Sequence, residues 1–238
     1  MFLEVNNVTK SFGGLVAISD LDLAVKEGEI VGLIGPNGSG KTTLFNLISG
    51  VLKPERGQIK FGGREITGLK PHRVCQSGIA RTFQLTKPFM HMTALQNVMI
   101  GRLYGSNPAL SIRQSKEECE RILEFIGLGG KSLARATTLG VVDRKRLEIA
   151  RALATKPKLL LLDEVMSGLT ATEMEEALKL VKAINDSGIT LIVVEHVMKT
   201  ILNLSTKLVV LNYGKKIAEG APQEVVRNPK VIDAYLGE

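Results

Sequence analysis

Tryptophan is absent from this sequence of 238 residues, cysteine occurs twice, and aromatic residues account for 4% of the chain. Cys75 and Cys119 are too few for a disulfide framework and lack the spacing of a metal site, so we expect a reduced, cytosolic environment. Long apolar runs are also missing, because residues 159–162 and 190–194 fall far short of the ~20 residues that span a bilayer. Glu4 and Asn6 interrupt the first residues before a signal-like apolar stretch forms. We therefore expect neither a membrane span nor an export signal.

Acidic residues are fewer than basic ones, since 24 Asp and Glu stand against 31 Lys and Arg, which makes the formal net charge +7. This excess favours anionic partners, such as nucleotide phosphates, acidic lipid surfaces or nucleic acid. The basic residues are spread along the chain and form no tail, so an ordinary solvated surface accounts for most of them. With 44% hydrophobic residues the chain can bury a substantial core, as one domain with a subdomain or as two small domains.

Short β-rich runs alternate with helical patterns along most of the chain. This alternation is typical of an α/β fold with a mostly parallel sheet. Four of the runs lack polar–apolar alternation, as strands covered on both faces should. The expected strands are residues 21–25, 29–34, 58–61, 159–163, 190–194 and 207–211.

The β signal disappears between about Lys87 and Thr155, where helical patterns cover residues 94–101, 116–126 and 144–155. Thr93 followed by Gln96 makes a capping box for the first of these helices. We therefore expect a single domain, residues 1–238, in which a helical subdomain (87–155) is inserted between two core segments (1–86 and 156–238).

Residues 35–42 read Gly-Pro-Asn-Gly-Ser-Gly-Lys-Thr and match the P-loop pattern, directly after an apolar strand and before a helical run at 43–49. The glycines permit a backbone curl whose N–H groups face inward, and the helix N-terminus adds positive potential. Lys41 would reach the terminal phosphates of ATP, and the Thr42 hydroxyl would bind Mg²⁺. The candidate nucleotide-binding residues here are Gly35, Asn37, Gly38, Ser39, Gly40, Lys41, Thr42 and Thr43.

A second motif is the run of four leucines at 159–162 that ends in Asp163 and Glu164. Asp163 would hold Mg²⁺ through water beside the P-loop. Glu164, just past the strand end, would polarise the attacking water as a general base. Alone, such a run is more often a strand that meets a solvated loop. The P-loop in the same chain reverses that preference.

Three further positions complete a resemblance to the ABC ATPase family across nearly the whole chain. Phe12, in Lys-Ser-Phe-Gly-Gly, stands where the family places an aromatic residue that stacks on adenine. Gln84, in Arg-Thr-Phe-Gln, matches the glutamine that senses Mg²⁺ and γ-phosphate at the joint with the helical subdomain. His196, in Val-Val-Glu-His, matches the histidine that contacts γ-phosphate. The resemblance implies a P-loop NTPase core with an N-terminal antiparallel β portion and an inserted helical subdomain.

That resemblance also implies an assignment of roles to the motif residues. The implied catalytic residues are Glu164, His196, Gln84 and Lys41, and the implied Mg²⁺ site consists of Thr42, Gln84 and Asp163.

Within the family, the chain looks most like the ATPase subunits of branched-chain amino acid importers, although importers of urea or of aromatic and other carboxylates carry similar ATPases. The motifs behind this likeness are Phe-Gly-Gly-Leu at 12–15, Arg-Thr-Phe-Gln at 81–84, Met-Thr-Ala-Leu-Gln-Asn-Val at 92–98, Leu-Glu-Ile-Ala-Arg-Ala-Leu at 147–153 and Ala-Tyr-Leu-Gly-Glu at 234–238. The implied partners are transmembrane permease subunits, a second ATPase subunit (the same chain or a paralogue) and an extracytoplasmic substrate-binding protein. The implied location is the cytoplasmic face of the inner or plasma membrane.

The chain departs from the family at the signature, a segment close to Leu-Ser-Gly-Gly-Gln that caps the ATP held by the opposite subunit. Counting back from residues 146–148 places Leu-Gly-Val-Val-Asp, residues 139–143, at this position. The serine hydroxyl is lost, and Val141 and Val142 stand where backbone should approach phosphate closely. We expect the helix N-terminus to persist, with its dipole toward an anion. An alternative alignment uses Thr138 and Gly140 but needs an insertion.

The loop at 165–170 also departs from the family, because Thr170 stands where many members carry aspartate. That loop normally couples the two sites of a head-to-tail dimer. The altered signature supports an alternative in which the chain is a regulatory or structural subunit that binds nucleotide but hydrolyses little. Glu164 and His196 oppose that alternative, since a purely structural domain requires neither.

A third hypothesis, a nucleic-acid-associated ABC protein, draws only on the +7 charge. The chain lacks a second cassette, a coiled-coil insertion and a basic tail, so we expect no nucleic-acid partner.

Overall fold

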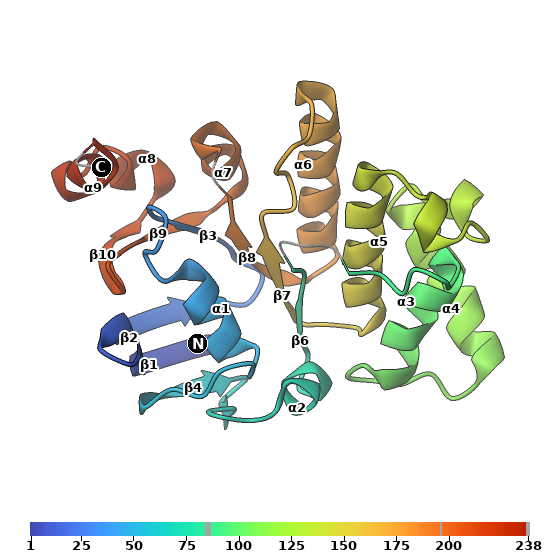
Figure 1. The fold of residues 1–238 in the computed structure, drawn as a ribbon, viewed down its shortest axis with the longest axis horizontal. Helices are drawn as coiled ribbons and strands as arrows, with labels where there is room; N and C mark the ends of the chain where they lie inside the picture. Colours follow the sequence, from blue (N-terminus) through green and yellow to red (C-terminus); the bar gives the residue numbers. More distant parts are fainter. Residues whose placement is uncertain (84–86, 196, 237–238) are drawn as a thin grey trace.

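The computed structural model describes residues 1–83, 87–195 and 197–236 (Figure 1). The strands are β1 (Leu3–Phe12), β2 (Leu15–Val25), β3 (Ile30–Ile34), β4 (Arg56–Phe61), β5 (Arg64–Glu65), β6 (Ile79–Arg81), β7 (Leu159–Asp163), β8 (Thr190–Val194), β9 (Lys207–Asn212) and β10 (Lys215–Gly220). The helices are α1 (Lys41–Ile48), α2 (Pro71–Gln76), α3 (Ala94–Tyr104), α4 (Ile112–Phe125), α5 (Val141–Ala154), α6 (Ala171–Asp186), α7 (Met198–Leu204), α8 (Pro222–Val225) and α9 (Pro229–Leu236), with 3-10 turns η1 (Gly129–Lys131) and η2 (Ala136–Thr138).

Two sheets form the core of the molecule. One is antiparallel, with strand order β2-β1-β4-β5. The other has the order β10-β9-β3-β8-β7-β6, in which every pair is parallel except β10 with β9. The expected α/β class with a mostly parallel sheet and an N-terminal antiparallel portion is confirmed.

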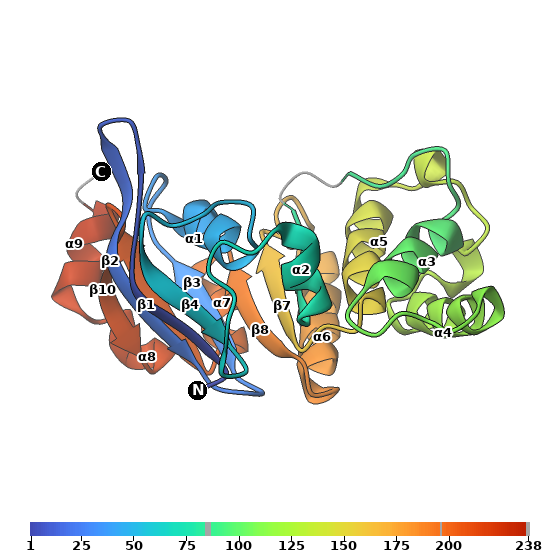
Figure 2. The same cartoon turned by 90° about the horizontal axis from the view of Figure 1, so that it is seen from below.

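The parallel sheet is covered on both faces, which explains why its strands read as continuous apolar runs. Residues of β7 alternate between two hydrophobic clusters: Leu160 and Leu162 pack with the helical cluster, while Leu159 and Leu161 pack with α1 and the antiparallel sheet. In Figures 1 and 2, α1 lies between the two sheets, and α6, α7 and α8 lie on the other side of the parallel sheet. The P-loop helix is therefore fixed between two layers.

A helical subdomain extends from one end of the parallel sheet, as Figures 1 and 2 show. Its elements α3, α4 and α5 follow β6 in the chain and precede β7. α3 and α5 approach closely at Gly101, where an added Cβ would lie 2.4 Å from the carbonyl oxygen of Arg151. The insertion expected from the sequence is confirmed, while its limits at 87 and 155 stay a prediction.

Strong local sequence signals predicted the positions of helices and strands well. The capping box is confirmed, because the Thr93 hydroxyl accepts from the Gln96 amide (3.1 Å) and Gln96 Oε1 accepts from the Thr93 amide (2.9 Å). Strands β1, β5, β6 and β10 were not predicted, and β5 has only two residues. β1 carries polar residues and register shifts, β6 has only three residues, and β10 is an edge strand with little burial.

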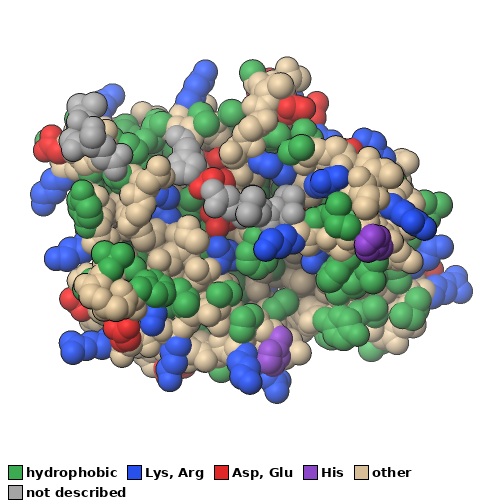
Figure 3. All heavy atoms as spheres, viewed as in Figure 1, with side chains coloured by type: hydrophobic (Ala, Val, Ile, Leu, Met, Phe, Trp, Pro, Cys, Tyr) green, Lys and Arg blue, Asp and Glu red, His purple; other side chains and the backbone are tan. Residues whose placement is uncertain are grey.

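Lysine and arginine side chains are spread over the face in Figure 3 instead of gathering in one place. This distribution agrees with the ordinary solvated surface expected from the sequence.

Candidate nucleotide-binding and hydrolysis site

The P-loop joins the end of β3 to the start of α1. Its backbone requires glycine at Gly35 (φ 150°) and Gly40 (φ 107°), since both lie in the region that side chains avoid. Packing adds to this requirement: a Cβ on Gly35 would lie 2.1 Å from the Leu211 carbonyl oxygen, and one on Gly40 would lie 2.7 Å from that of Ala17. The loop is thus held between β9 and β2, with α1 beginning directly at Lys41.

The Lys41 side chain folds back into this loop. Its Nζ donates to the carbonyl oxygens of Gly35 (2.7 Å) and Pro36 (2.8 Å) and to the Ser39 hydroxyl (3.4 Å), and the residue is 7% exposed. A buried ammonium beside a helix N-terminus makes the loop a receptor for anions.

Asp163 ends β7 at the same edge of the sheet, because β3 and β7 are both parallel neighbours of β8. The carboxylate is buried, and its Oδ2 accepts from Arg81 Nη2 at 2.9 Å. A second guanidinium nitrogen, Arg81 Nη1, donates to Asn46 Oδ1 at 2.5 Å, and the guanidinium lies over the rings of Phe45 and Phe83. A fixed arginine therefore orients the carboxylate.

Glu164 has an unusual backbone for a non-glycine residue, with φ 51°. Such conformations cost about 1–3 kcal/mol and cluster at functional sites. The Glu164 amide donates to the Val194 carbonyl (3.0 Å), and its own carbonyl accepts from the Ser167 amide (3.3 Å). The side chain of half-buried Glu164 thus projects from a constrained turn just after Asp163.

The end of β8 joins the same turn. Glu195 is 4% exposed, and its Oε1 accepts from the Met166 amide at 2.9 Å. His196 follows directly, but His196 and Gln84 lie outside the described residues, so their predicted contacts stay predictions.

Comparisons with known proteins agree with this geometry. Residues 18–167 match the ABC transporter family, and residues 215–238 match the family described as branched-chain amino acid ATP-binding cassette transporter. The chain belongs to the ABC transporter ATP-binding family. It is 38% identical to the high-affinity branched-chain amino acid transport ATP-binding protein BraF of Pseudomonas aeruginosa, over 99% of this chain and 98% of that protein.

Solved structures of ATP-binding cassettes share the fold. The ADP conformation of MJ1267, a cassette of an ABC transporter, has a TM-score of 0.91 and 33% identity over 100% of this chain and 99% of that one. A dimeric post-hydrolysis state of the cassette MJ0796, bound to ADP and Pi, has a TM-score of 0.84 and 26% identity over 93% and 99%. This cassette is therefore a nucleotide-binding ATPase, and cassettes of its fold form dimers.

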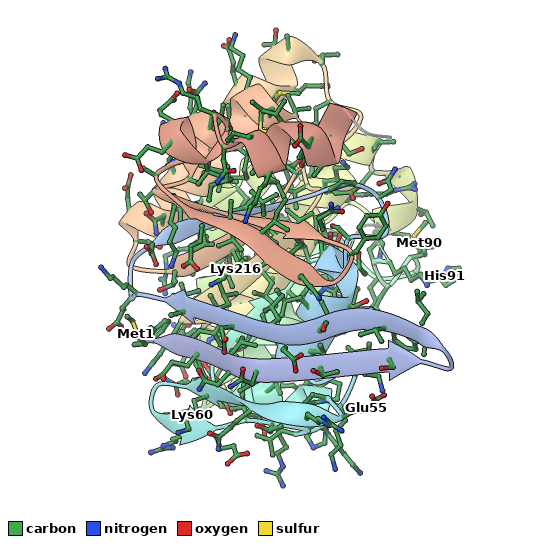
Figure 4. The ribbon with its side chains drawn as sticks, turned by 90° about the vertical axis from the view of Figure 1, so that its left-hand side faces the viewer. Met1, Glu55, Lys60, Met90, His91 and Lys216 are labelled. Atoms are coloured by element: carbon green, nitrogen blue, oxygen red, sulfur yellow. The ribbon has the colours of Figure 1, made fainter. Side chains whose placement is uncertain are left out.

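The β1–β2 hairpin and the signature segment are two further candidate regions of the cassette. Phe12 ends β1 at the tip of the β1–β2 hairpin, where it is 48% exposed and Lys10 Nζ lies 5.4 Å from its ring centroid. Figure 4 shows the two strands running side by side from the end near Met1 to this turn. The exposed ring is available for stacking.

The signature segment forms the start of α5, as expected for a helix N-terminus. Gly140 is the N-cap residue and supplies no side-chain cap, while Val141 is 69% exposed. Asp143 in the first turn pairs with Lys131 at 2.6 Å. Thr170 has a separate structural role, since it caps α6 in a capping box with Glu173.

A cavity of about 620 Å³ lies between the core and the helical subdomain. It is lined by Thr42 and Asp163 from the nucleotide side and by Pro71, Ile100 and Arg151 from α2, α3 and α5. The described residues include no helix long and apolar enough to cross a membrane.

Sequence reasoning missed three charged residues of this region. Arg81 belongs to a motif quoted for the family likeness, but its partner Asp163 lies 82 positions away. Glu148 accepts from the Phe83 amide (2.7 Å), and burial raises the pKa of Glu148 to about 7 despite that hydrogen bond and nearby Arg151. Lys145 contacts the Glu164 turn, and burial lowers the pKa of Lys145. For Glu148 and Lys145, the signal in the sequence was a charged residue on the face of a predicted helix that packs against the core.

Proposed function

We propose that this ATPase powers a membrane importer for branched-chain or related amino acids. The observation that carries the proposal is the match of residues 215–238 to a branched-chain amino acid cassette family, together with the likeness to BraF over nearly the full length.

The test is uptake into proteoliposomes that contain the chain with its permease subunits and binding protein. Labelled leucine should enter with ATP and wild-type chain, and uptake should stop with Glu164→Gln. Uptake of urea in place of leucine would overturn the amino-acid assignment, and ATP-independent uptake would overturn the motor role.

The site fits Mg-ATP by the chemistry of its donors. Mg²⁺ prefers oxygen ligands and keeps waters, and it is often held by one or two carboxylates together with substrate phosphates. The Thr42 hydroxyl and Asp163 carboxylate, which line one cavity, supply oxygen atoms from the protein, and Gln84 would add its amide oxygen. When bound, the ion neutralises charge on the phosphates. Residues 35–43 and Lys41 would hold the phosphates, and Phe12 would stack on adenine.

Glu164 would act as the general base toward the attacking water, and His196 would contact the γ-phosphate. The constrained Glu164 turn supports this role, because a catalytic carboxylate must be held within hydrogen-bond reach of the water. Glu164→Gln should lower turnover about 100-fold or more while ATP still binds.

Two cassettes would close head to tail on two ATP molecules, each P-loop facing the partner's segment 139–143. Permease subunits would dock at the helical subdomain, residues 87–155, near Gln84 and the segment following it. The working location would be the cytoplasmic face of the inner or plasma membrane, with an extracytoplasmic binding protein that delivers cargo.

A regulatory subunit with little hydrolysis is the second candidate, because Gly140 and Val141 stand where the signature carries serine and glycine. Mg²⁺-dependent turnover by the purified chain across protein concentrations separates the two. Turnover that rises more than linearly and vanishes in Glu164→Gln supports a self-pairing ATPase. Intact ATP binding with no turnover, also in the presence of the permease, supports the regulatory role.

A further inference from the structure

Lys145 connects the helical subdomain to the turn that carries Glu164. Its side chain projects from the second turn of α5, and its Nζ donates to the carbonyl oxygens of Glu164 (3.5 Å) and Ser167. Both acceptors belong to the loop after β7 in the core. One side chain therefore contacts the backbone of the proposed base from a different subdomain.

The Glu164 backbone is held from three directions. The Glu164 amide donates to the Val194 carbonyl, and the Glu164 carbonyl accepts from both the Ser167 amide and Lys145 Nζ. The positive φ of Glu164 persists only where the surroundings impose it. Lys145 supplies a restraint that comes from outside the core.

The positive charge of Lys145 is complementary to the carboxylates around it. The carboxylates that interact with it electrostatically are Glu195 after β8, Glu164 after β7 and Glu148 on α5 itself. An ammonium can satisfy several acceptors at once because it carries three donors. An apolar side chain of equal length would lose both carbonyl contacts and the attraction to these carboxylates.

We propose that Lys145 is a positioning residue that sets the backbone of Glu164 according to the position of the signature helix. Segment 139–143 spans the N-terminus of α5, so movement of this helix toward a partner's nucleotide would move Lys145 with it. This coupling rests on the proposed function, since it requires Glu164 to act on water. The hydrogen-bond restraint itself does not.

The test compares variants at this position with a matched control. Lys145→Met keeps the length and removes the donors, Lys145→Gln shortens the side chain, and Lys145→Arg keeps the charge and donors. Glu176→Gln is the control, because it removes the charge from another contact between α5 and the core, the 2.6 Å Arg146–Glu176 ion pair, without touching residues 164–167.

Steady-state ATP turnover should fall about tenfold or more in kcat for Lys145→Met and Lys145→Gln, with KM for ATP within about twofold of wild type. Lys145→Arg should recover most of the activity, and Glu176→Gln should stay near wild type. A rise in KM at unchanged kcat, an equal loss in Glu176→Gln, or no rescue by arginine would overturn the proposal.

Amide hydrogen exchange gives a readout that needs no turnover. Exchange in peptides covering residues 164–169 should speed up in Lys145→Met and stay slow in Lys145→Arg, with the P-loop peptide unchanged. Faster exchange in a chain that hydrolyses no ATP would refute the proposed function and keep the restraint. Unchanged exchange in both Lys145→Met and Lys145→Gln would refute the restraint itself.

Discussion

The P-loop and the signature segment are both helix N-termini that begin with glycine, yet their surroundings differ. At Gly40 the backbone has φ 107° and an added Cβ would lie 2.7 Å from the Ala17 carbonyl oxygen. At Gly140 φ is −67°, and nothing lies within 4 Å of an added Cβ. The first glycine is enforced by packing inside this chain, whereas the second faces open space. Gly140 can therefore change at little cost to folding, whereas its neighbours Leu139 and Asp143 are held by the core and by Lys131.

The largest expected effect follows from replacing the tightly packed glycine of the P-loop. Gly35→Ala should lower the free energy of unfolding by about 3 kcal/mol or more, because its Cβ would lie 2.1 Å from the Leu211 carbonyl oxygen at a φ that alanine avoids. Gly140→Ala should cost less than about 1 kcal/mol. Urea unfolding measures both. Equal losses would show that the two glycines do not differ as described.

The next effect concerns the Arg81–Asp163 pair beside the P-loop, whose side chains are 6% and 4% exposed. Arg81→Met should destabilise by about 3 kcal/mol, because it leaves a buried carboxylate unpaired. Asp163→Asn added to Arg81→Met should recover part of this loss. A double-mutant cycle from urea titrations gives the coupling, and additive losses would contradict it.

The raised pKa of Glu148, about 7, makes stability depend on pH. The folded state binds this proton more tightly than the unfolded state, whose carboxyl has a pKa near the ordinary value of 4.5. Stability from this group is complete below about pH 4.5 and is lost as the pH rises through about 7, a change of up to about 2 kcal/mol. Glu148→Gln should flatten the unfolding free energy over that interval, as measured by urea titrations at several pH values. An unchanged slope would show that Glu148 titrates normally.

The smallest effects concern helix caps, because α3 begins with a side-chain cap and α5 does not. Thr93→Ala should cost about 1 kcal/mol, because α3 loses its capping box. Gly140→Asn should stabilise by about 0.3 kcal/mol, because α5 lacks a side-chain cap. Thermal unfolding measures both shifts. A loss of stability in Gly140→Asn would mean that the start of α5 is more constrained than its open surroundings indicate.

Local patterns predicted much of the fold. β7 and β8 have the expected limits, and the α3 capping box is present. α5 begins three residues before the predicted start, because the signature segment lacks the residues that mark a helix N-terminus. Strands β1 and β10 were missed, because the register shift between Val5 and Val8 breaks the alternation of buried residues in β1, and β10 is an edge strand with little burial.

The P-loop, the carboxylates Asp163 and Glu164 at the end of β7, and the family could all be inferred from the sequence, because each depends on residues close together in the chain. The groups that surround them are set by long-range packing. Arg81 reaches Asp163 across 82 positions, Glu148 reaches the Phe83 amide across 65, and Lys145 reaches the Glu164 carbonyl across 19. Such contacts depend on how α5 packs against the strand ends, which local hydrophobic periodicity does not specify.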